Sequence, residues 1–482
     1  MAEEKFDLKE LDDLERRIGG KKLDYIRFEF SDLNGLSRGV TVPRKQVPSA
    51  LKNGVSFFAG ALSITPRADL VFIKELVDLH LPNCTYLPSP HTLQLLPWAG
   101  KRTNAGKTED NQRTIGQVLC ESAWIAPFRG GGRMEACPRY LLRKQLDRLD
   151  KLGYVFKSAF EVEFTAYNKS TNKPVFPGVD AGSTLVFSQF EDYLLTLDEN
   201  LQQIGIDASS IVVEHGEGQF EFALEPSDGI KSADSLFRAK HAIKEISHQF
   251  GYQATFMSKP TKDASPNGLH LNVSLWKKYA DGTLKNAFHD AADKHGLSLL
   301  HRYWIAGLIK HGKSLCAFYC PTYNCYKRIH KFMAPDKIDW GVDDRTAAFR
   351  AKSSSHAATY CENRIPSGAS NPYLVVAATI IAGLDGIINR LDVQPARTDR
   401  IDPATTATVG KRRDSVKDNV FPYSLSEALD ELENDDIMRE CLGEEFIRWF
   451  VQMKREGEIE TLDNLSEEEQ WQKERELYFE FI

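Results

Sequence analysis

Two glutamates stand two residues apart in Phe160-Glu161-Val162-Glu163-Phe164, where polar and apolar residues alternate as in a β-strand. Because successive side chains of a strand point to opposite faces, Glu161 and Glu163 share one face and Val162 lies on the other. Two neighbouring carboxylates can bridge hard divalent cations. A solvent-exposed strand has the same pattern, so the pair alone leaves both interpretations open.

Further acidic and polar residues follow at strand-like spacing. After an apolar strand, glycines allow the backbone to bend between Glu214 and Glu221, although an acidic turn is the simpler alternative. Downstream, His270, Asn272 and Ser274 alternate with apolar residues and so share one strand face. A single histidine in a strand is more often structural than a ligand.

Arginines gather in the segments that follow, at residues 326–328, 344–350 and 362–364. Guanidinium groups bind carboxylates and phosphates through two parallel hydrogen bonds, which a site for anionic substrates needs. The sequence contains neither GxxxxGK[ST] nor GxGxxG. Nucleotide binding would therefore depend on carboxylate-held metals and arginines.

The elements that position these residues fall into two regions. Strand patterns over residues 25–30, 39–42, 55–58 and 70–73 predict a small mixed sheet. The polar stretch 100–111 and a glycine-rich loop after it place a boundary near residue 128. We therefore expect an N-terminal domain of residues 1–127 and a C-terminal domain of residues 128–482.

The second region begins with leucines at helical spacing, which predict a helix that ends at Gly153 and is followed by a strand over 155–166. Ser424 and Glu427 predict a capping box at the start of a late helix. The charged last stretch still carries Trp471 and other aromatic residues. It predicts a terminal helix packed on the body or on a neighbouring chain.

The amino-acid composition limits which binding partners and which cellular compartment are expected. The 482 residues carry 61 basic and 68 acidic side chains, a net charge of −7, which gives no basic surface for nucleic acid or an anionic membrane. Eight cysteines without CxxC pairs and an acidic, amphipathic start favour a cytoplasmic protein with reduced thiols. The longest apolar run, Tyr373 to Leu384, is shorter than the roughly 18 residues that span a bilayer and predicts a buried helix.

Taken in order, these segments resemble the class I signatures of the glutamine synthetase family. The similar motifs are E-x-E at 161–163, E-H-G-x-G-Q-x-E at 214–221, G-L-H-x-N-x-S at 268–274, N-x-Y-K-R at 324–328, D-R-T-x-x-x-R at 344–350 and E-x-R at 362–364. The segments 30–39 and 96–98 extend the resemblance over essentially the whole chain. Six ordered motifs are far more specific than any single one.

The resemblance implies an α+β fold, with a small β-grasp-like N-terminal domain and a large catalytic domain built on an antiparallel sheet or half-barrel with helices. It implies two metal sites for Mg²⁺ or Mn²⁺, one held by Glu163, Glu214 and Glu221 and the other by Glu161, His270 and Glu362. Arg328 and Arg364, with Gly268, would bind the substrate carboxylate. Arg345 and Arg350, with Ser274, would bind ATP, and Arg345 and Arg328 would act in catalysis.

The sequence departs from the family where ammonia is handled. Ala59 stands where ammonia-using enzymes carry an aspartate, and Met333 stands at the position of a glutamate in a flap that is one residue shorter here. Pro266 removes an amide proton before the metal-binding histidine. Asn272 and Tyr360 replace a histidine and an arginine of the family pattern. The resemblance thus implies a ligase whose ammonium site is dismantled.

Three functions follow from this resemblance. The first is an ATP-dependent ligase that joins the γ-carboxylate of glutamate to an organic amine through an acyl phosphate. The second is a non-catalytic assembly protein like those of the lengsin branch, which the C-terminal segments 442–451 and 478–482 resemble. Ordinary glutamine synthesis from ammonia is the third. The family also implies a homododecamer of stacked hexameric rings, with active sites shared between neighbouring subunits.

Overall fold

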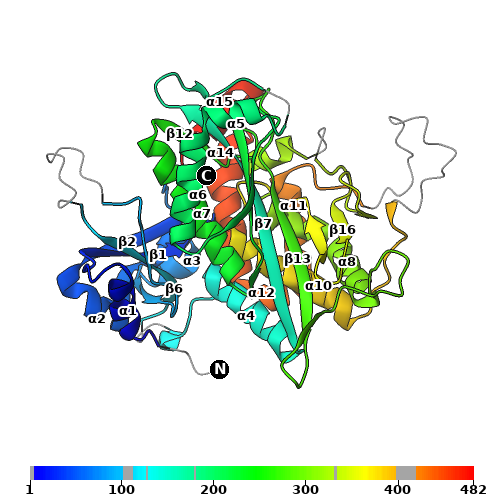
Figure 1. The fold of residues 1–482 in the computed structure, drawn as a ribbon, viewed down its shortest axis with the longest axis horizontal. Coiled ribbons are helices and arrows are strands. Elements are labelled where there is room, and N and C mark those ends of the chain that lie inside the picture. The colour runs from blue at the N-terminus through cyan, green and yellow to red at the C-terminus, as the bar shows by residue number, and fades with distance from the viewer. Residues whose placement is uncertain (1–4, 101–111, 126–128, 179–180, 330–333, 398–418) are drawn as a thin grey trace.

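Two β-sheets of different size organise the molecule, and Figure 1 shows the smaller one in blue beside the larger one. This computed structural model describes residues 5–100, 112–125, 129–178, 181–329, 334–397 and 419–482. The small sheet is built from residues 25–123 and the large one from residues 154–363. The expected α+β class is confirmed, whereas the predicted boundary between residues 127 and 128 lies outside the described residues.

The small sheet has the strand order β2-β1-β6-β4-β3, with β5 paired to β6. β1 and β6 run parallel, with Tyr25 opposite Ile115, and the other pairs are antiparallel. The Asp32 carboxylate closes the turn after β1, since it accepts hydrogen bonds of 2.9 Å from the backbone of Asn34 and Leu36. The elements are β1 (Tyr25–Ser31), β2 (Ser37–Pro43), β3 (Val55–Phe58), β4 (Asn83–Pro88), β5 (Gln94–Leu95), β6 (Ile115–Ala123), α1 (Lys9–Arg17), α2 (Val47–Asn53), α3 (Lys74–Asp78), η1 (Arg44–Gln46) and η2 (Ala59–Leu62).

The strand predicted over residues 70–73 is wrong. Its residues alternate in exposure as a strand would, with Leu70 and Phe72 exposed and Val71 and Ile73 buried. The segment pairs with no strand of the described chain and runs directly into α3. The alternation of exposed and buried residues therefore resembles a strand, although the segment has no neighbouring strand to pair with in the described chain.

The large sheet has the order β15-β16-β17-β13-β7-β10-β9, with β8, β11 and β12 paired to β7 and β14 to β13. All of its pairs are antiparallel except β15 with β16. The strands are β7 (Tyr154–Asn168), β8 (Lys173–Pro174), β9 (Ala208–Val213), β10 (Gln219–Leu224), β11 (Ser227–Asp228), β12 (Tyr252–Thr255), β13 (Leu269–Lys278), β14 (Leu284–Asn286), β15 (Trp340–Val342), β16 (Phe349–Ser353) and β17 (Thr359–Asn363).

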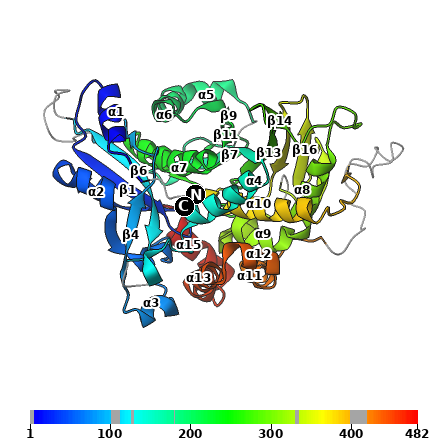
Figure 2. The ribbon, with the colours of Figure 1, turned by 90° about the horizontal axis from the view of Figure 1, so that it is seen from below.

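Helices surround this sheet, and Figure 2 shows α4 beside α10, which also packs on α8. The predicted buried helix is α10, whose apolar run is almost entirely inaccessible. In the described part of the chain, no helix has the length and apolar character of a membrane span. The helices are α4 (Pro138–Lys151), α5 (Thr184–Gln189), α6 (Glu191–Gln203), α7 (Lys231–Gln249), α8 (Leu299–Lys310), α9 (Gly312–Tyr319), α10 (Pro372–Ile388), α11 (Leu425–Glu433), α12 (Asp436–Leu442), α13 (Glu444–Lys454), α14 (Glu460–Leu462) and α15 (Glu467–Tyr478), with the short 3-10 helices η4 (Arg129–Gly131) and η5 (Tyr323–Lys327) and the π-helical segment η8 (Arg455–Ile459).

Two late helices begin at serine N-caps that differ in their hydrogen bonds. At α11, the Ser424 hydroxyl accepts the Glu427 N–H at 3.1 Å, but the Glu427 carboxylate accepts from Tyr423 and not from Ser424. The predicted capping box is therefore only half formed. A complete box, Ser466 with Glu469, begins α15, the expected terminal helix, which packs on the body of its own chain.

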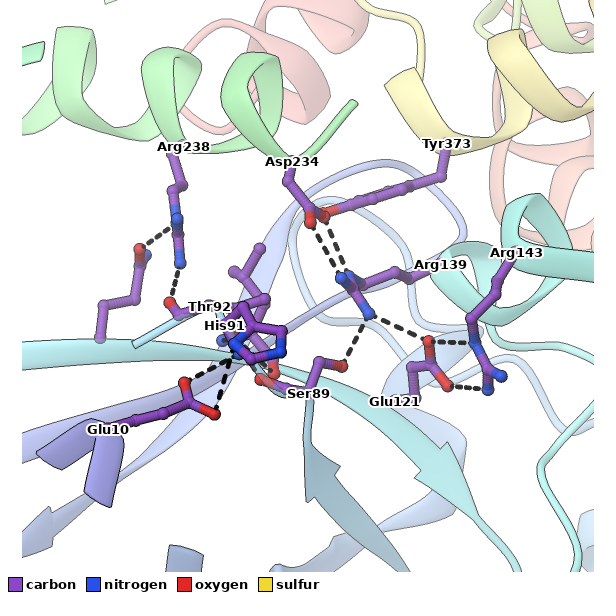
Figure 3. A network of polar contacts seen from close by, with 12 residues as sticks. Glu10, Ser89, His91, Thr92, Glu121, Arg139, Arg143, Asp234, Arg238 and Tyr373 are labelled. Atoms are coloured by element: carbon purple, nitrogen blue, oxygen red, sulfur yellow. Dashed lines mark hydrogen bonds and ion pairs between the residues drawn. The ribbon is translucent and has the colours of Figure 1, made fainter. Parts of the chain in front are cut away.

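A buried polar network joins the small sheet to the helices of the large domain (Figure 3). Arg139 of α4 binds Asp234 of α7 through two bonds of 2.9 Å and Glu121 of β6 at 3.0 Å. A second contact between the two regions is made by the buried Lys454 of α13, whose ammonium group donates to Asn34 Oδ1 at 2.7 Å. These bonds fix the small sheet against the large domain.

Candidate active site

Five neighbouring strands, β10, β7, β13, β17 and β16, carry most of the predicted site residues in one row across the large sheet. The alternating apolar residues, such as Val162 and Leu271, are fully buried on the opposite face. The strand register brings residues that are far apart in sequence directly opposite one another. The facing pairs, in order across the sheet, are Glu221 and Glu163, Glu161 and His270, Asn272 and Glu362, and Glu362 and Arg350.

Three of these residues form a cluster that could hold a metal ion. Glu161, Glu221 and His270 each offer one ligand atom, and these atoms lie within 4.8 Å of one another. His270 Nδ1 is 3.2 Å from a Glu161 oxygen, and the Asn272 amide donates to the other oxygen at 2.9 Å. The carboxylate oxygens of Glu161 and Glu221 are ligands that suit Mg²⁺ or Mn²⁺. The cluster takes members from both ligand sets that the family resemblance implies.

The pKa values of the two carboxylates in the cluster are shifted in opposite directions. Burial disfavours ionisation of Glu161, but the hydrogen bonds from His270 and Asn272 outweigh it and lower its pKa to about 2. Burial, followed by the negative charges of Glu163, Glu161 and Glu214, raises the pKa of Glu221 to about 9. A bound divalent cation would offset the negative charges around Glu221, so the cluster has the electrostatics of a cation site.

Glu163 and Glu214 lie beside this cluster but have partners of their own. The Glu163 carboxylate accepts hydrogen bonds from the Gly268 N–H at 2.6 Å and from the Gln219 amide at 3.2 Å. Glu214 lies in the turn after β9, where burial and then the charge of Glu163 raise its pKa. Both remain near enough to Glu221 to affect its pKa.

Glu362 is held by arginines. Its carboxylate accepts from Arg350 Nη1 at 2.9 Å and from Arg364 Nη1, and its side chain is only 2% exposed. The nearest contact to the cluster is 3.9 Å, from His270 Nδ1. Arg350 also binds the exposed Asp343. A metal at this ligand would therefore compete with the two guanidinium groups.

Arg328 reaches the cluster from the end of η5. Its buried guanidinium donates to the carbonyl oxygens of Ile365, at 2.6 Å, and Arg364, at 3.1 Å. A side chain on Gly268 would lie 3.1 Å from Arg328 Nη2, 3.2 Å from His270 Nε2 and 3.3 Å from Glu163 Oε1. Glycine at this position thus leaves room between a cation, an imidazole and a carboxylate.

The structure does not bring Arg345 and Ser274 to this cluster. Arg345 is exposed in the turn between β15 and β16, and Ser274 lies further along β13, where it accepts the Trp276 indole N–H at 3.0 Å. Met333 lies outside the described residues. Ala59 is buried in η2, within the small-sheet region.

Three site residues were not singled out by sequence reasoning. The Gln219 amide donates to Glu163, to the Pro266 carbonyl and to Asn267, and so links two predicted segments. Asn267 is fully buried, and its Nδ2 binds the Met257 carbonyl at 3.0 Å. Asp343 binds Arg350. Gln219 lies inside the motif at 214–221 and Asn267 directly precedes the motif at 268–274, so their positions were visible in the sequence, whereas their partners depend on the fold.

Comparison with known proteins identifies the class. The model of the glutamine synthetase catalytic domain matches residues 135–475. Three relatives are each 30% identical: a glutamine synthetase of Pyrococcus horikoshii, over 92% of both chains; a lengsin of Canis lupus familiaris, over 92% of this chain and 72% of its own; and a glutamate–methylamine ligase of Methyloversatilis universalis, over 89% of this chain and 91% of its own.

A solved structure of apo GmaS without ligand aligns with a TM-score of 0.78 and 25% identity, covering 95% of this chain and 98% of that one. The fold and the match over residues 135–475 thus place the chain in the class of proteins that carry a glutamine synthetase catalytic domain. The chain belongs to the glutamine synthetase family. The relatives have different names within that family, so the comparison does not determine which substrate this chain uses.

Proposed function

We propose that this protein is an ATP-dependent ligase that activates the γ-carboxylate of glutamate as an acyl phosphate and transfers it to an organic amine. The observation that carries the proposal is the convergence of Glu161, Glu221 and His270 within 4.8 Å, beside Arg328 and Gly268. A cluster of acids retained without a cation repels itself, as the raised pKa of Glu221 indicates. A bound metal ion would remove this repulsion, so the cluster is more stable with a metal than without one.

In this mechanism the predicted residues have separate tasks. Glu161, Glu221 and His270, with Glu163, Glu214 and Glu362, would hold Mg²⁺ or Mn²⁺, which neutralises phosphate charge when ATP is bound. Arg328 and Arg364 would bind the carboxylates of the acid substrate, and Arg350 and Arg345 the phosphates. The carboxylate oxygen attacks the γ-phosphorus, ADP leaves, and the amine nitrogen then attacks the carbonyl carbon and releases phosphate.

The choice of an organic amine rests on the missing ammonium site. Ala59 has no basic or acidic group, and a methyl side chain cannot bind or deprotonate ammonium. The relative from Methyloversatilis universalis is named a glutamate–methylamine ligase. Both observations favour a substituted amine over ammonia.

A second candidate is a non-catalytic assembly protein of the lengsin type. It is favoured by the exposed position of Arg345, by the two arginines on Glu362, and by the 30% identical lengsin. In that case the acidic cluster would bind metal only to stabilise the large domain.

We also propose that copies of the chain assemble into stacked hexameric rings in the cytoplasm, with small molecules rather than nucleic acid or membranes as their other partners. Exposed apolar residues on the small-sheet region, Phe57, Leu70 and Phe72, support a contact between copies. Light scattering on the purified protein tests this assembly. A monomer at micromolar concentration would contradict it.

The deciding experiment measures phosphate release from ATP with Mg²⁺ and glutamate while ammonia, hydroxylamine, methylamine, ethanolamine and polyamines are added in turn. Glu161→Gln is the matched control, because it keeps the shape of the side chain and removes its charge. Turnover that needs one amine and is lost in the control supports the ligase and names its acceptor. Metal and ATP binding without turnover for any amine supports the assembly protein instead.

A further inference from the structure

Glu474, a buried carboxylate of α15, binds a turn next to the candidate active site. Its side chain is fully inaccessible. One oxygen accepts from Asn324 Nδ2 at 2.7 Å, and the other accepts from Lys327 Nζ at 2.6 Å. Both donors belong to η5, and the Lys327 ammonium also lies 3.8 Å from the centre of the Trp471 ring. α15 therefore fixes η5 from outside the site.

The first consequence concerns Arg328, the residue that follows η5. Its backbone N–H donates to the Cys325 carbonyl at 3.0 Å, so its main chain moves with the turn. Its guanidinium lies against Gly268 and donates to Ile365 and Arg364. Fixing η5 thus fixes where this cation points.

The second consequence concerns Gly268, through the Asn324 amide. Asn324 accepts from the Lys259 N–H at 2.7 Å and donates to the Lys259 carbonyl at 3.0 Å. The residue before Lys259, Ser258, accepts the Asn267 N–H at 2.8 Å. Asn267 precedes Gly268, whose N–H binds Glu163. One carboxylate on α15 is therefore connected to both sides of the space between Arg328 and Gly268.

We infer that Glu474 is a positioning residue that holds Arg328 and Gly268 at a fixed separation and thereby sets the affinity for the acid substrate. The identity of that substrate rests on the proposed function, but the positioning does not. Glu474 itself lies outside the reacting groups. Glu474→Gln is the sharpest test, because an amide has one acceptor oxygen for two donors and leaves one of them unpaired.

The first measurement is hydrogen–deuterium exchange of the full chain, which needs no activity. In Glu474→Gln the amides of residues 323–328 and 257–268 are expected to exchange about tenfold faster, as when a buried charge-assisted hydrogen bond is lost. Glu476→Gln, an exposed residue of the same helix, is the matched control and should exchange like the natural protein. Unchanged exchange, or an equal increase throughout β7 and β13, overturns the inference.

The second measurement is kinetic. In Glu474→Gln the KM for glutamate should rise about tenfold, with kcat and the KM for ATP nearly unchanged. The reason is that a less firmly held Arg328 binds the substrate more weakly in the ground state and in the transition state by the same amount. A fall in kcat at constant KM overturns the inference. If Glu474→Gln does not fold, Lys327→Met removes one donor instead and should give the same pattern. Absence of turnover in the natural protein rejects the proposed function, while the exchange result still decides the positioning role.

Discussion

Glu161 and Glu221 differ by several pKa units although they lie in one cluster. Hydrogen bonds from His270 and Asn272 stabilise the charge on Glu161, whereas Glu221 faces other carboxylates. Burial, together with these neighbouring charges, favours the protonated form of Glu221. A divalent cation bound here would balance the negative charges and release that proton.

This acidity gives a pH-dependent prediction for metal-free protein. The folded pKa of Glu221 is raised from 4.5 to about 9, so the stability it contributes is complete below pH 4.5 and is lost as pH rises toward about 9. In Glu221→Gln, unfolding measured between pH 5 and 9 should show a weaker decline. The same substitution should reduce the rise in Tm that Mg²⁺ or Mn²⁺ produces in the natural protein. An equal metal-induced rise in both proteins would place the cation elsewhere.

At this scale the sequence predicts which side chains share a face but not which atoms meet. Alternation along 160–164 and 269–274 was sufficient to orient Glu161, Glu163 and His270. The binding of Glu362 by Arg350 depends on the register between β16 and β17, which no local pattern encodes. The exposed position of Arg345 likewise depends on a turn.

Among the helices, His311 joins three elements. It precedes α9, and its ring nitrogens lie 2.7 Å from Asp435, the N-cap of α12, and 3.1 Å from Asp385 of α10. Burial opposes the charged imidazole, but Asp435 and then Asp385 outweigh burial and raise the pKa of His311. The pKa values of both aspartates are lowered in turn.

Replacing His311 should therefore cost most stability in weakly acidic solution. The histidine contribution is complete below pH 6.5 and is lost as pH rises through its raised pKa, while the aspartate contribution is lost as pH falls below 3.8. His311→Gln should lower the free energy of unfolding by about 1.5–3 kcal/mol near pH 6 and by less near pH 9. Urea titrations at both values measure this. Lys310→Gln, which removes the half-exposed neighbour of Asp385, should have a smaller effect.

The contact between α8 and α10 is made backbone to backbone. A side chain at Gly386 would lie 2.0 Å from the Tyr303 carbonyl, and one at Gly307 would lie 2.0 Å from the Ala382 carbonyl. Gly386→Ala should therefore force the helices apart and lower the free energy of unfolding by about 1–3 kcal/mol. Gly132→Ala is the control, because its added methyl group meets no atom within 4 Å. Equal stability of the two variants in chemical denaturation would contradict this packing.

Long periodic elements were predictable from the sequence, and short ones were less so. The helix ending at Gly153, the strand over 155–166 and the buried α10 were found because their patterns extend over several turns or residues. The segment 70–73 has the alternation of a strand but no partner, and pairing is a property of the fold.

At the scale of the whole molecule, the Arg139 network connects β6 of the small sheet to α4 and α7 (Figure 3). Arg139→Met should leave Asp234 and Glu121 buried with fewer positive partners, which costs about 3–5 kcal/mol of unfolding free energy. Arg143→Met should cost less, because its guanidinium is 36% exposed and Glu121 keeps its other arginines. Denaturation followed by tryptophan fluorescence compares the two variants. Equal losses of unfolding free energy in the two variants would show that Arg139 stabilises the protein no more than Arg143 does.

The family, and with it the general architecture, was predictable because ordered motifs extend over the whole chain. How the two sheets dock was not, since Arg139, Asp234 and Glu121 come from separate elements and none belongs to a recognised motif. Contacts of this kind are set by three-dimensional packing, and a single sequence carries no pattern for them.

The bond between Lys454 and Asn34 also has a consequence for biosynthesis. Its two residues are 420 positions apart, so at about 5–20 residues per second the ribosome needs about 20–80 s to supply the second after the first. During that interval the small sheet exists without the lysine that will bind it. The Asn34 amide oxygen of the newly made N-terminal region therefore stays without its lysine donor until α13 has been synthesised.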